Sequence, residues 1–335
     1  MASPELSKLV QSVVEPYLLE GPRRYNRVEV AELSGVPAEL SRRLWVSLGF
    51  PAHDDDAAVE FTDGDVNAVR NFRSLDALAG ADVRRQQAAA RTLGQSMARL
   101  AEWQVDLVAE EIADRIRSIT AGDPGVDQDK VAREATAEVV SALQQLQAYA
   151  WRRHLAAALT RSLAGDGTGE TLRELAVGFA DMVGYTRLTR HLEADELDDL
   201  LESFESVTTD AITANGGWTI KNVGDEVMFA AESAVAAGRI ALAIQEATTS
   251  AGTTPELRVG LAYGQVLQRF GDLYGSVVNT AARLTGVARP GTVLVDDGAA
   301  TQLADEPEFS LRNLRSVRVR GINRLGSHVL RRNPG

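Results

Sequence analysis

A glycine-rich stretch near the middle of the chain separates two halves with different sequence patterns. It reads AGDGTGET at positions 164–171, and its three glycines and small polar residues are typical of a hinge. The half before it is rich in strong helix formers, whereas the half after it alternates short apolar runs with helical segments. A chain of 335 residues is long enough for two domains. We therefore expect an all-α domain over 1–164, a linker over 165–174 and an α+β domain over 175–335.

Long helices dominate the prediction for the first half. Val83 to Ile119 and Val131 to Leu163 are rich in helix formers, and Pro124 with two glycines separates them. Two long helices joined by a short break pack as an antiparallel hairpin. A shorter amphipathic helix is expected over Ser3–Leu19. The first long helix is expected to bury an apolar stripe that consists of Leu93, Met97, Leu100, Val105, Val108 and Ile112.

Two short helices joined at Gly35 are predicted within VEVAELSGVPAELSRRLWVSLGF, positions 28–50. The pattern is that of a helix-turn-helix with Arg42 and Arg43 on its second helix, so a DNA-binding regulator is one alternative function. A plain helical subdomain is the other interpretation. The net charge of −12 and the pI near 5.0 favour the latter and argue against nucleic acid as a partner. Thr62 or Asp63 is expected to cap the next helix.

Composition excludes several other classes of site. The chain has no cysteine, so disulfides, thiolate metal sites and cysteine nucleophiles are excluded. The N-terminus MASPELSKLV lacks the basic and apolar regions of a signal peptide, and no apolar run approaches the length of a membrane span. We therefore expect a cytoplasmic protein without a membrane span.

The second half predicts strands and helices in alternation. LAVGFA, LRVGLAYGQVLQRF, TVLVDD and the segment from VRVRGINR to HVL are strand-like, and WTIKNVGDEVMFAA resembles two strands around a turn. AVAAGRIALAIQEA and NTAARLTGVA have helical spacing, and DMVGYTRLTRHL resembles a helix start. Strands mixed with helices and joined by tight glycine turns predict an α+β domain.

Two aspartates stand where strands are predicted to end. Asp181 follows LAVGFA and precedes MVGYT, so it is interpreted either as a helix cap or as a metal ligand. Asp225 follows Gly224 between two strand-like runs, so a Gly-Asp turn is one interpretation of it. The other interpretation joins the two acids. Carboxylates at the ends of adjacent strands can hold two divalent cations on a polyphosphate, because such cations prefer oxygen ligands.

Four further polar residues have both a plain and a functional interpretation. Lys221 lies in an apolar strand, where a lysine requires a polar partner unless it is solvated at a hairpin edge. Asp272 precedes a loop that contains glycine. Asn279 and Arg283 are four residues apart, so they share one helix face and can present an amide and a guanidinium to one ligand. Their plain interpretations are a helix cap for Asn279 and a solvated side chain for Arg283.

The order FADMVGYT, KNVGDE and D-x6-N-x3-R resembles that of the class III nucleotide cyclases, and the resemblance extends from about Leu175 to the end of the chain. It implies a ferredoxin-like βαββαβ core. It also implies that two divalent metal ions, Mg²⁺ or Mn²⁺, bind to Asp181 and Asp225. Lys221 and Asp272 match the residues that read the adenine base in this family.

The same resemblance implies the remaining roles in the site. Asn279 and Arg283 match the asparagine and arginine that orient the ribose and stabilise the transition state. The β- and γ-phosphates are expected along the backbone of the segment Gly184, Tyr185 and Thr186. A lysine of the family's final strand usually contacts the triphosphate, and this chain has Arg320 at that place in VRVRGI.

The implied reaction converts ATP to 3′,5′-cyclic AMP and pyrophosphate. ATP is favoured over GTP because an aspartate accepts a hydrogen bond from the adenine amino group, whereas guanine presents a carbonyl there. In the family the site lies between two domains packed head to tail, so a single domain that carries every role implies a homodimer. A catalytically weak nucleotide sensor or dimeric scaffold is the alternative.

The helical half resembles regulatory domains that precede the catalytic domain in some bacterial class III adenylate cyclases, where they are autoinhibitory. The input is expected to be a small molecule, a lipid or pH. His154 in the second long helix and His191 after the first aspartate motif are candidates for a pH response, because histidine titrates near neutral pH. Ordinary surface histidines are the plain interpretation of both.

Overall fold

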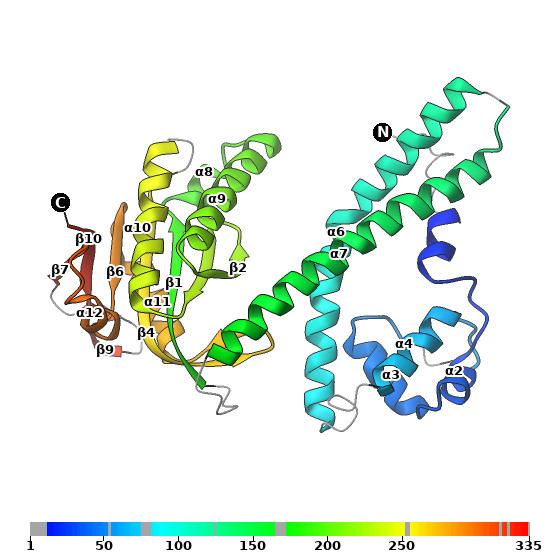
Figure 1. The fold of residues 1–335 in the computed structure, drawn as a ribbon, viewed down its shortest axis with the longest axis horizontal. Helices are drawn as coiled ribbons and strands as arrows, with labels where there is room; N and C mark the ends of the chain where they lie inside the picture. The colour runs from blue at the N-terminus through cyan, green and yellow to red at the C-terminus, as the bar shows by residue number, and fades with distance from the viewer. Residues whose placement is uncertain are drawn as a thin grey trace. The chain divides into compact units, whose positions relative to one another are not determined.

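The computed structural model describes residues 12–52, 55–74, 82–123, 125–164, 172–251, 255–314, 317–319 and 322–333. The chain divides into two compact units, Met1–Ser162 and Leu163–Gly335, which are drawn in Figure 1 and are described one by one below. Most of the glycine-rich stretch, residues 165–171, lies outside the described residues, as do Pro124 and the start of the helix expected over Ser3–Leu19.

The first unit is helical throughout its described elements, as the sequence predicts. A helix covers residues 12–18, and it is followed by α2 (Arg27–Ser34), α3 (Ala38–Ser47), α4 (Asp63–Ser74), α6 (Val83–Gly122) and α7 (Gln128–Ala164). The predicted turn between α2 and α3 is confirmed, because Gly35 ends α2 with a left-handed φ of 68°. At the start of α4, the Thr62 Oγ1 and the amide of Asp65 lie 3.4 Å apart. The Asp65 carboxylate accepts in return from the Thr62 amide at 2.7 Å.

Arginines in and beside the helix-turn-helix segment make contacts within the first unit. Arg43 forms an ion pair with Glu39 one turn earlier. Arg70 and Arg73, on α4, donate to the carbonyl oxygens of Leu33 and Gly35, which lie at the end of α2. The guanidinium groups of Arg70 and Arg73 thus bind α4 to the end of α2.

The two long helices form the predicted antiparallel hairpin. Ile112 and Ile116 of α6 are buried against Val131 and Ala135 of α7. Farther from the turn, Gln147 of α7 donates to Gln104 of α6. With increasing distance from the turn, the contacting residues have higher numbers on α7 and lower numbers on α6, so the two helices are antiparallel.

The expected apolar stripe of α6 is only partly correct. Ile112 is buried, but Leu93, Met97 and Val105 are exposed. The first part of α6 instead buries the side that carries Ala88 and Gly94. A Cβ at Gly94 would collide with the backbone of Leu48, so α6 approaches the end of α3 at backbone distance.

The second unit combines one large sheet with helices on both sides. Its strands are β1 (Leu172–Met182), β2 (Trp218–Val223), β3 (Glu226–Ala231), β4 (Leu257–Arg269), β5 (Asp272–Tyr274), β6 (Thr292–Val295), β7 (Phe309–Asn313), β8 (Val317–Val319), β9 (Ile322–Leu325) and β10 (His328–Arg332). Its helices are α8 (Tyr185–Leu188), α9 (Ala194–Ala214), α10 (Ala234–Ala251), α11 (Ser276–Val287) and α12 (Asp297–Leu303).

The expected βαββαβ core is present. The large sheet has the order β2-β3-β1-β4-β6-β10-β7, with β5 paired to β4. Strand β1 is antiparallel to both of its neighbours, β3 and β4, and β2 is antiparallel to β3. With α9 after β1 and α10 after β3, these four strands have the ferredoxin-like order 4-1-3-2. Strand β1 therefore lies between two neighbours from Ala176 to Asp181, the part that leads to its end.

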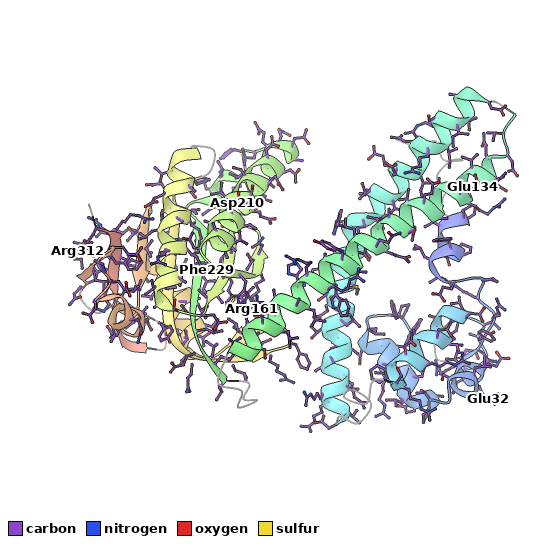
Figure 2. All side chains as sticks on the ribbon, viewed as in Figure 1. Glu32, Glu134, Arg161, Asp210, Phe229 and Arg312 are labelled. Atoms are coloured by element: carbon purple, nitrogen blue, oxygen red, sulfur yellow. The ribbon has the colours of Figure 1, made fainter. Side chains whose placement is uncertain are left out.

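A hydrophobic layer covers each face of this sheet. One face packs against α9 and α10, with Phe204 and Ile240 fully buried, and α10 lies along the sheet in Figure 1. The other face packs against α11 through Val277 and Ala281. Phe229 of β3, labelled in Figure 2, is also fully buried. A Cβ at Gly178 of β1 would collide with its ring, so the ring packs directly on the β1 backbone.

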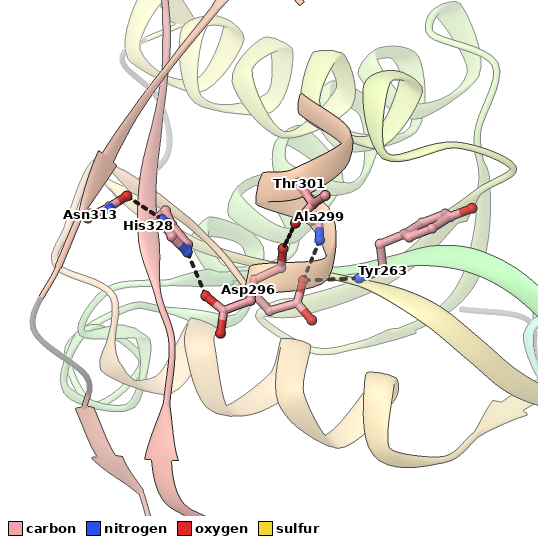
Figure 3. A network of polar contacts seen from close by, with 7 residues as sticks. Tyr263, Asp296, Ala299, Thr301, Asn313 and His328 are labelled. Carbon is pink, nitrogen blue, oxygen red and sulfur yellow. Dashed lines mark hydrogen bonds and ion pairs between the residues drawn. The ribbon is translucent and has the colours of Figure 1, made fainter. Parts of the chain in front are cut away.

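A separate polar network fixes the start of α12 (Figure 3). Asp296 accepts hydrogen bonds from the amides of Ala299, at 2.8 Å, and Tyr263, at 3.2 Å. Beside it, the two ring nitrogens of His328 contact Asp297 and Asn313, both at 2.7 Å. Burial raises the pKa of the Asp296 carboxyl, and these two amide hydrogen bonds oppose the shift.

Candidate active site

Asp181 and Asp225 come together at one end of the large sheet. Asp181 is the second-last residue of β1, and Asp225 follows Gly224 in the turn between β2 and β3. The amide of Met182 donates to the carbonyl oxygen of Asp225 at 3.0 Å, which ties the strand end to the turn. Helix α8 begins after Gly184, and no side chain caps it, so the interpretation of Asp181 as a helix cap is wrong.

Asp181 is the middle residue of a charged row across three strands. In the antiparallel register it lies opposite Glu226 of β3 on one side and opposite Arg258 of β4 on the other. Residues that are directly opposite in a sheet share a face. The Arg258 guanidinium forms an ion pair with the Asp181 carboxylate, whose side chain is only 15% exposed. From β3 through β1 to β4, the row therefore consists of the carboxylates of Glu226 and Asp181 and the guanidinium of Arg258.

The carboxylates of this end of the sheet influence one another. Burial raises the pKa of the Asp225 carboxyl, and the negative charge of Asp181 raises it further. Burial also raises the pKa of Glu226, with smaller contributions in the same direction from Asp181 and Asp225. Closely spaced, partly buried acids are costly to ionise without a cation, so this cluster favours positive charge.

Lys221 and Asp272 form the second polar pair of the domain. Lys221 lies on β2 and Asp272 begins β5, and the Lys221 Nζ lies 2.7 Å from an Asp272 carboxylate oxygen. The other Asp272 oxygen accepts from the amide of Leu273 at 2.9 Å. Lys221 has the expected polar partner, and it is also partly solvated on the edge strand β2. Both side chains remain partly exposed, at 46% and 30%, so the pair is accessible to a ligand.

Asn279 and Arg283 lie one turn apart on α11. The helix starts at Ser276 after Gly275, so Asn279 is inside the helix and is not its cap. Asn279 is exposed and Arg283 is half-buried. The helix is seated on the sheet at Gly260, where a Cβ would collide with Thr285 and with the carbonyl of Ala281. Among the described residues, no hydrogen bond or ion pair joins Asn279 or Arg283 to the Asp181 cluster or to the Lys221–Asp272 pair.

The segment after Asp181 presents backbone amides. Gly184 has a left-handed φ of 78°, and the first hydrogen bonds of the short helix α8 start at the amides of Arg187 and Leu188. Within the described part of the chain, the amides of Gly184, Tyr185 and Thr186 donate to no other group. Such amides are suited to anionic oxygens.

Comparison with known proteins identifies the second unit. The family model described as "Adenylate and Guanylate cyclase catalytic domain" matches residues 169–332. An adenylate cyclase of Streptomyces coelicolor is 40% identical over 87% of this chain and 74% of its own length. The chain belongs to the class III nucleotide cyclase family. The predicted family and fold are thus confirmed.

Two other relatives of this cyclase are named adenylate cyclase. The protein of Streptomyces griseus is 38% identical over 88% of this chain and 72% of its own length. That of Glutamicibacter nicotianae is 32% identical over 98% of this chain and 84% of its own length. Since the catalytic-domain model covers only residues 169–332, these relatives also share much of the helical unit.

Some functional candidates of the cyclase were not predicted, and one prediction remains outside the structure. Glu226 and Arg258 were missed, although GDEV contains two consecutive acids and LRVG places an arginine at the start of a strand. Arg320 lies outside the described residues. His154 and His191 are both exposed, and their regulatory role stays a prediction. Across the described helices, none has the length and hydropathy needed to cross a membrane.

Proposed function

We propose that this cyclase converts ATP to 3′,5′-cyclic AMP and pyrophosphate. The observation that carries the proposal is the pairing of Asp181 with Asp225 at the sheet end, in a domain that also presents the Lys221–Asp272 pair. The relatives named adenylate cyclase support the choice of reaction. The ribose 3′-hydroxyl of ATP would attack its α-phosphorus, and the bond to the β-phosphate oxygen would break to release pyrophosphate.

The carboxylates of Asp181 and Asp225 fit divalent cations. Their donor atoms are carboxylate oxygens, which Mg²⁺ and Mn²⁺ prefer. Among the described residues, no group of three or more histidine, aspartate or glutamate side chains is arranged to hold a metal ion by itself. Two carboxylates completed by water and substrate phosphates are a typical ligand set for Mg²⁺ in phosphoryl-transfer sites. Two such ions, held by Asp181 and Asp225, would lower the pKa of the 3′-hydroxyl and neutralise the leaving pyrophosphate.

The protein's own groups would bind and orient the nucleotide. Asp272 would accept from the adenine amino group, and Lys221 would donate to a ring nitrogen. The free amides of the segment Gly184 to Thr186 would receive the β- and γ-phosphate oxygens. Arg320, in the late strand segment, is proposed to contact the same triphosphate.

The helix α11 would supply the groups closest to the reacting bond. Asn279 would orient the ribose, and Arg283 would stabilise the charge that develops on the transferring phosphorus. Arginine suits this role because its forked donors match phosphoryl oxygens and it stays charged. Positioning and charge stabilisation dominate phosphoryl chemistry, so we expect Arg283 to affect turnover more than ATP affinity.

The active site is proposed to be shared between two copies of the chain. The acids of one copy would face the base- and ribose-binding residues of the other, which gives a homodimer two equivalent sites. In support, no polar contact within one described chain connects Asn279 or Arg283 to Asp181. The helical unit over residues 1–164 is proposed to regulate this assembly.

Cyclase assays on the full-length protein test the proposed reaction. The measurement is cyclic AMP from ATP and cyclic GMP from GTP, each with Mg²⁺ or Mn²⁺. We expect cyclic AMP to dominate, and we expect Arg283→Ala to lower kcat about 10²- to 10³-fold. Arg239→Ala is the matched control, since Arg239 pairs with Glu308 in the same domain, away from the site. Binding of ATP without any cyclic product would instead support the nucleotide-sensor alternative.

A further inference from the structure

Arg258 occupies a position in the charged row that none of the proposed catalytic steps uses. It lies at the start of β4, directly opposite Asp181 in the β1–β4 register. Its guanidinium donates to one oxygen of the Asp181 carboxylate. On the other side of Asp181 the row continues with Glu226, so Arg258 is the cation of a group that is otherwise acidic. Its removal would leave Asp181 without its ion-pair partner.

The contact between Arg258 and Asp181 uses only part of the guanidinium. A terminal nitrogen makes the bond to Asp181, whereas the Nε is buried and has no hydrogen-bond partner among the described residues. An arginine that is fixed permanently on a carboxylate commonly uses its fork to make two parallel bonds. A buried donor without a partner is costly, so this arrangement holds the carboxylate without satisfying the arginine.

A divalent cation and a guanidinium exclude each other from the same carboxylate oxygen. Both need that oxygen at close range, and two cations a few ångströms apart repel each other strongly in a partly buried site. Asp181 is only 15% exposed, and Arg258 is 30% exposed, so solvent screens this repulsion weakly.

We propose that Arg258 is the built-in counter-cation of Asp181, which a divalent metal ion must displace when it binds. This inference rests on the proposed metal-binding role of Asp181. Arg258 keeps the Asp181 carboxylate in place when the metal is absent. It also weakens metal binding, because part of the binding free energy is used to break the ion pair. The metal affinity of the enzyme is therefore set by an arginine that is not a metal ligand.

Metal binding without nucleotide tests the proposal independently of catalysis. The free Mn²⁺ concentration is measured by electron paramagnetic resonance as full-length wild-type protein and Arg258→Gln are titrated. We expect the Kd for Mn²⁺ to be about three- to tenfold lower in Arg258→Gln, since the competing ion pair is absent. An unchanged or higher Kd would overturn the proposal, because an arginine that only positions Asp181 would help the metal to bind.

Two controls separate this proposal from the proposed function. Arg239→Gln removes a partly exposed arginine from the same domain and should leave the Kd unchanged. Asp181→Asn should abolish the Mn²⁺ binding that Arg258→Gln strengthens. If Asp181→Asn and wild type bind Mn²⁺ equally, the metal site itself is wrong and both proposals fall. If Asp181→Asn loses binding but Arg258→Gln gains none, only the role of Arg258 is refuted.

A measurement on the wild-type chain covers the case in which Arg258→Gln does not fold. The side-chain ¹⁵N resonances of arginine are recorded while diamagnetic Mg²⁺ is added, and Arg258→Lys identifies the signal of Arg258. We expect that signal to shift and to exchange faster with solvent as Mg²⁺ saturates the site, because the bond to Asp181 is broken. A signal that stays the same at saturation contradicts displacement.

Discussion

At the scale of single residues, Lys221 has the most specific expected effect. Its Nζ lies 2.7 Å from Asp272, and the pair remains open to solvent. If the pair reads adenine, loss of the lysine removes a charge-assisted hydrogen bond to the base as well as the group that orients Asp272. Base selectivity would therefore depend on a contact made before any bond is broken.

We expect Lys221→Met to lower kcat/KM for ATP by about 10- to 100-fold, the value of one charge-assisted hydrogen bond. The activity with GTP should change less, so the ratio between the two nucleotides should fall. Lys130→Met is the matched control, because Lys130 forms an exposed ion pair with Glu134 in the helical unit. Equal losses with ATP and GTP would show that Lys221 does not read the base.

A second residue-scale prediction concerns Asp296. Burial raises the pKa of its carboxyl above the ordinary 3.8, so the folded protein binds this proton more tightly than the unfolded chain. The contribution of Asp296 to the free energy of unfolding therefore falls as pH rises from about 4 through the raised pKa. Asp296→Asn keeps an oxygen that can accept from Ala299 and Tyr263 but cannot ionise.

We accordingly expect Asp296→Asn to gain stability relative to wild type as pH rises from 4 to 7. Urea unfolding midpoints over that range measure the effect, with the exposed Asp305→Asn as control. A difference between Asp296→Asn and wild type that does not vary with pH would contradict the assignment.

At the scale of elements, the contact between α11 and β4 positions two of the proposed catalytic residues. Gly260 allows the helix to approach at backbone distance, and Thr285 of the helix also donates to the carbonyl of Phe179 on β1 at 3.3 Å. Any side chain at position 260 must push α11 away from the sheet. Asn279 and Arg283 move with the helix, so the packing of α11 against β4 determines their position.

We expect Gly260→Ala to destabilise the domain by about 1–3 kcal/mol through overpacking and to lower kcat in the protein that remains folded. Gly286→Ala, a substitution on α11 itself, is the matched control, because a Cβ at this position would meet no atom within 4 Å. That substitution should be neutral or slightly stabilising. Wild-type stability and turnover in Gly260→Ala would show that α11 has room to relax.

The local patterns of the second half predicted most of its strands, although β5 and β7 were missed, and they could not supply relations between strands. The β2–β3 hairpin, β4, α10 and α11 follow from apolar spacing within a few residues. Helix α9 was not predicted, because its acidic sequence ADELDDLLESFESV obscures the apolar face that holds Phe204. Arg258 became a candidate only through its register with Asp181, 77 positions earlier. Such a pairing is a property of the sheet.

The apolar stripe predicted for α6 was partly wrong for a similar reason, because apolar spacing does not show which side of a helix lies against another element. Leu93, Met97 and Val105 have helical spacing, but Ala88 and Gly94 are the residues that face a neighbour. Small residues allow close backbone approach, and an apolar count gives them little weight. The functional residues of the site were accessible from sequence for a different reason. Their residue types and their order in the sequence match a family. The fold was needed to show which of them lie close together.

At the scale of the whole molecule, the proposed shared site makes a stoichiometric prediction. Asp181→Ala and Asn279→Ala should each be inactive alone. In a heterodimer of the two, one of the two sites receives Asp181 and Asn279 from the intact copies. An equal mixture that exchanges freely forms half heterodimers, so about a quarter of all sites should be intact. We therefore expect about a quarter of wild-type activity.

The heterodimer must be verified directly, for example by purification through two different tags. Asp181→Ala mixed with Asp225→Ala is the matched control, because both substitutions affect the same half of the site. In that mixture each site contains one defective aspartate set, so activity should stay absent. Recovery in the control, or none in the test mixture, would contradict a site divided in this way.

The central place of β1 has a consequence for how the enzyme is made. Asp181 is synthesised 77 residues before Arg258, and β1 obtains its second neighbour only when β4 follows. During translation the chain therefore carries its acids for some time without the arginine that balances them.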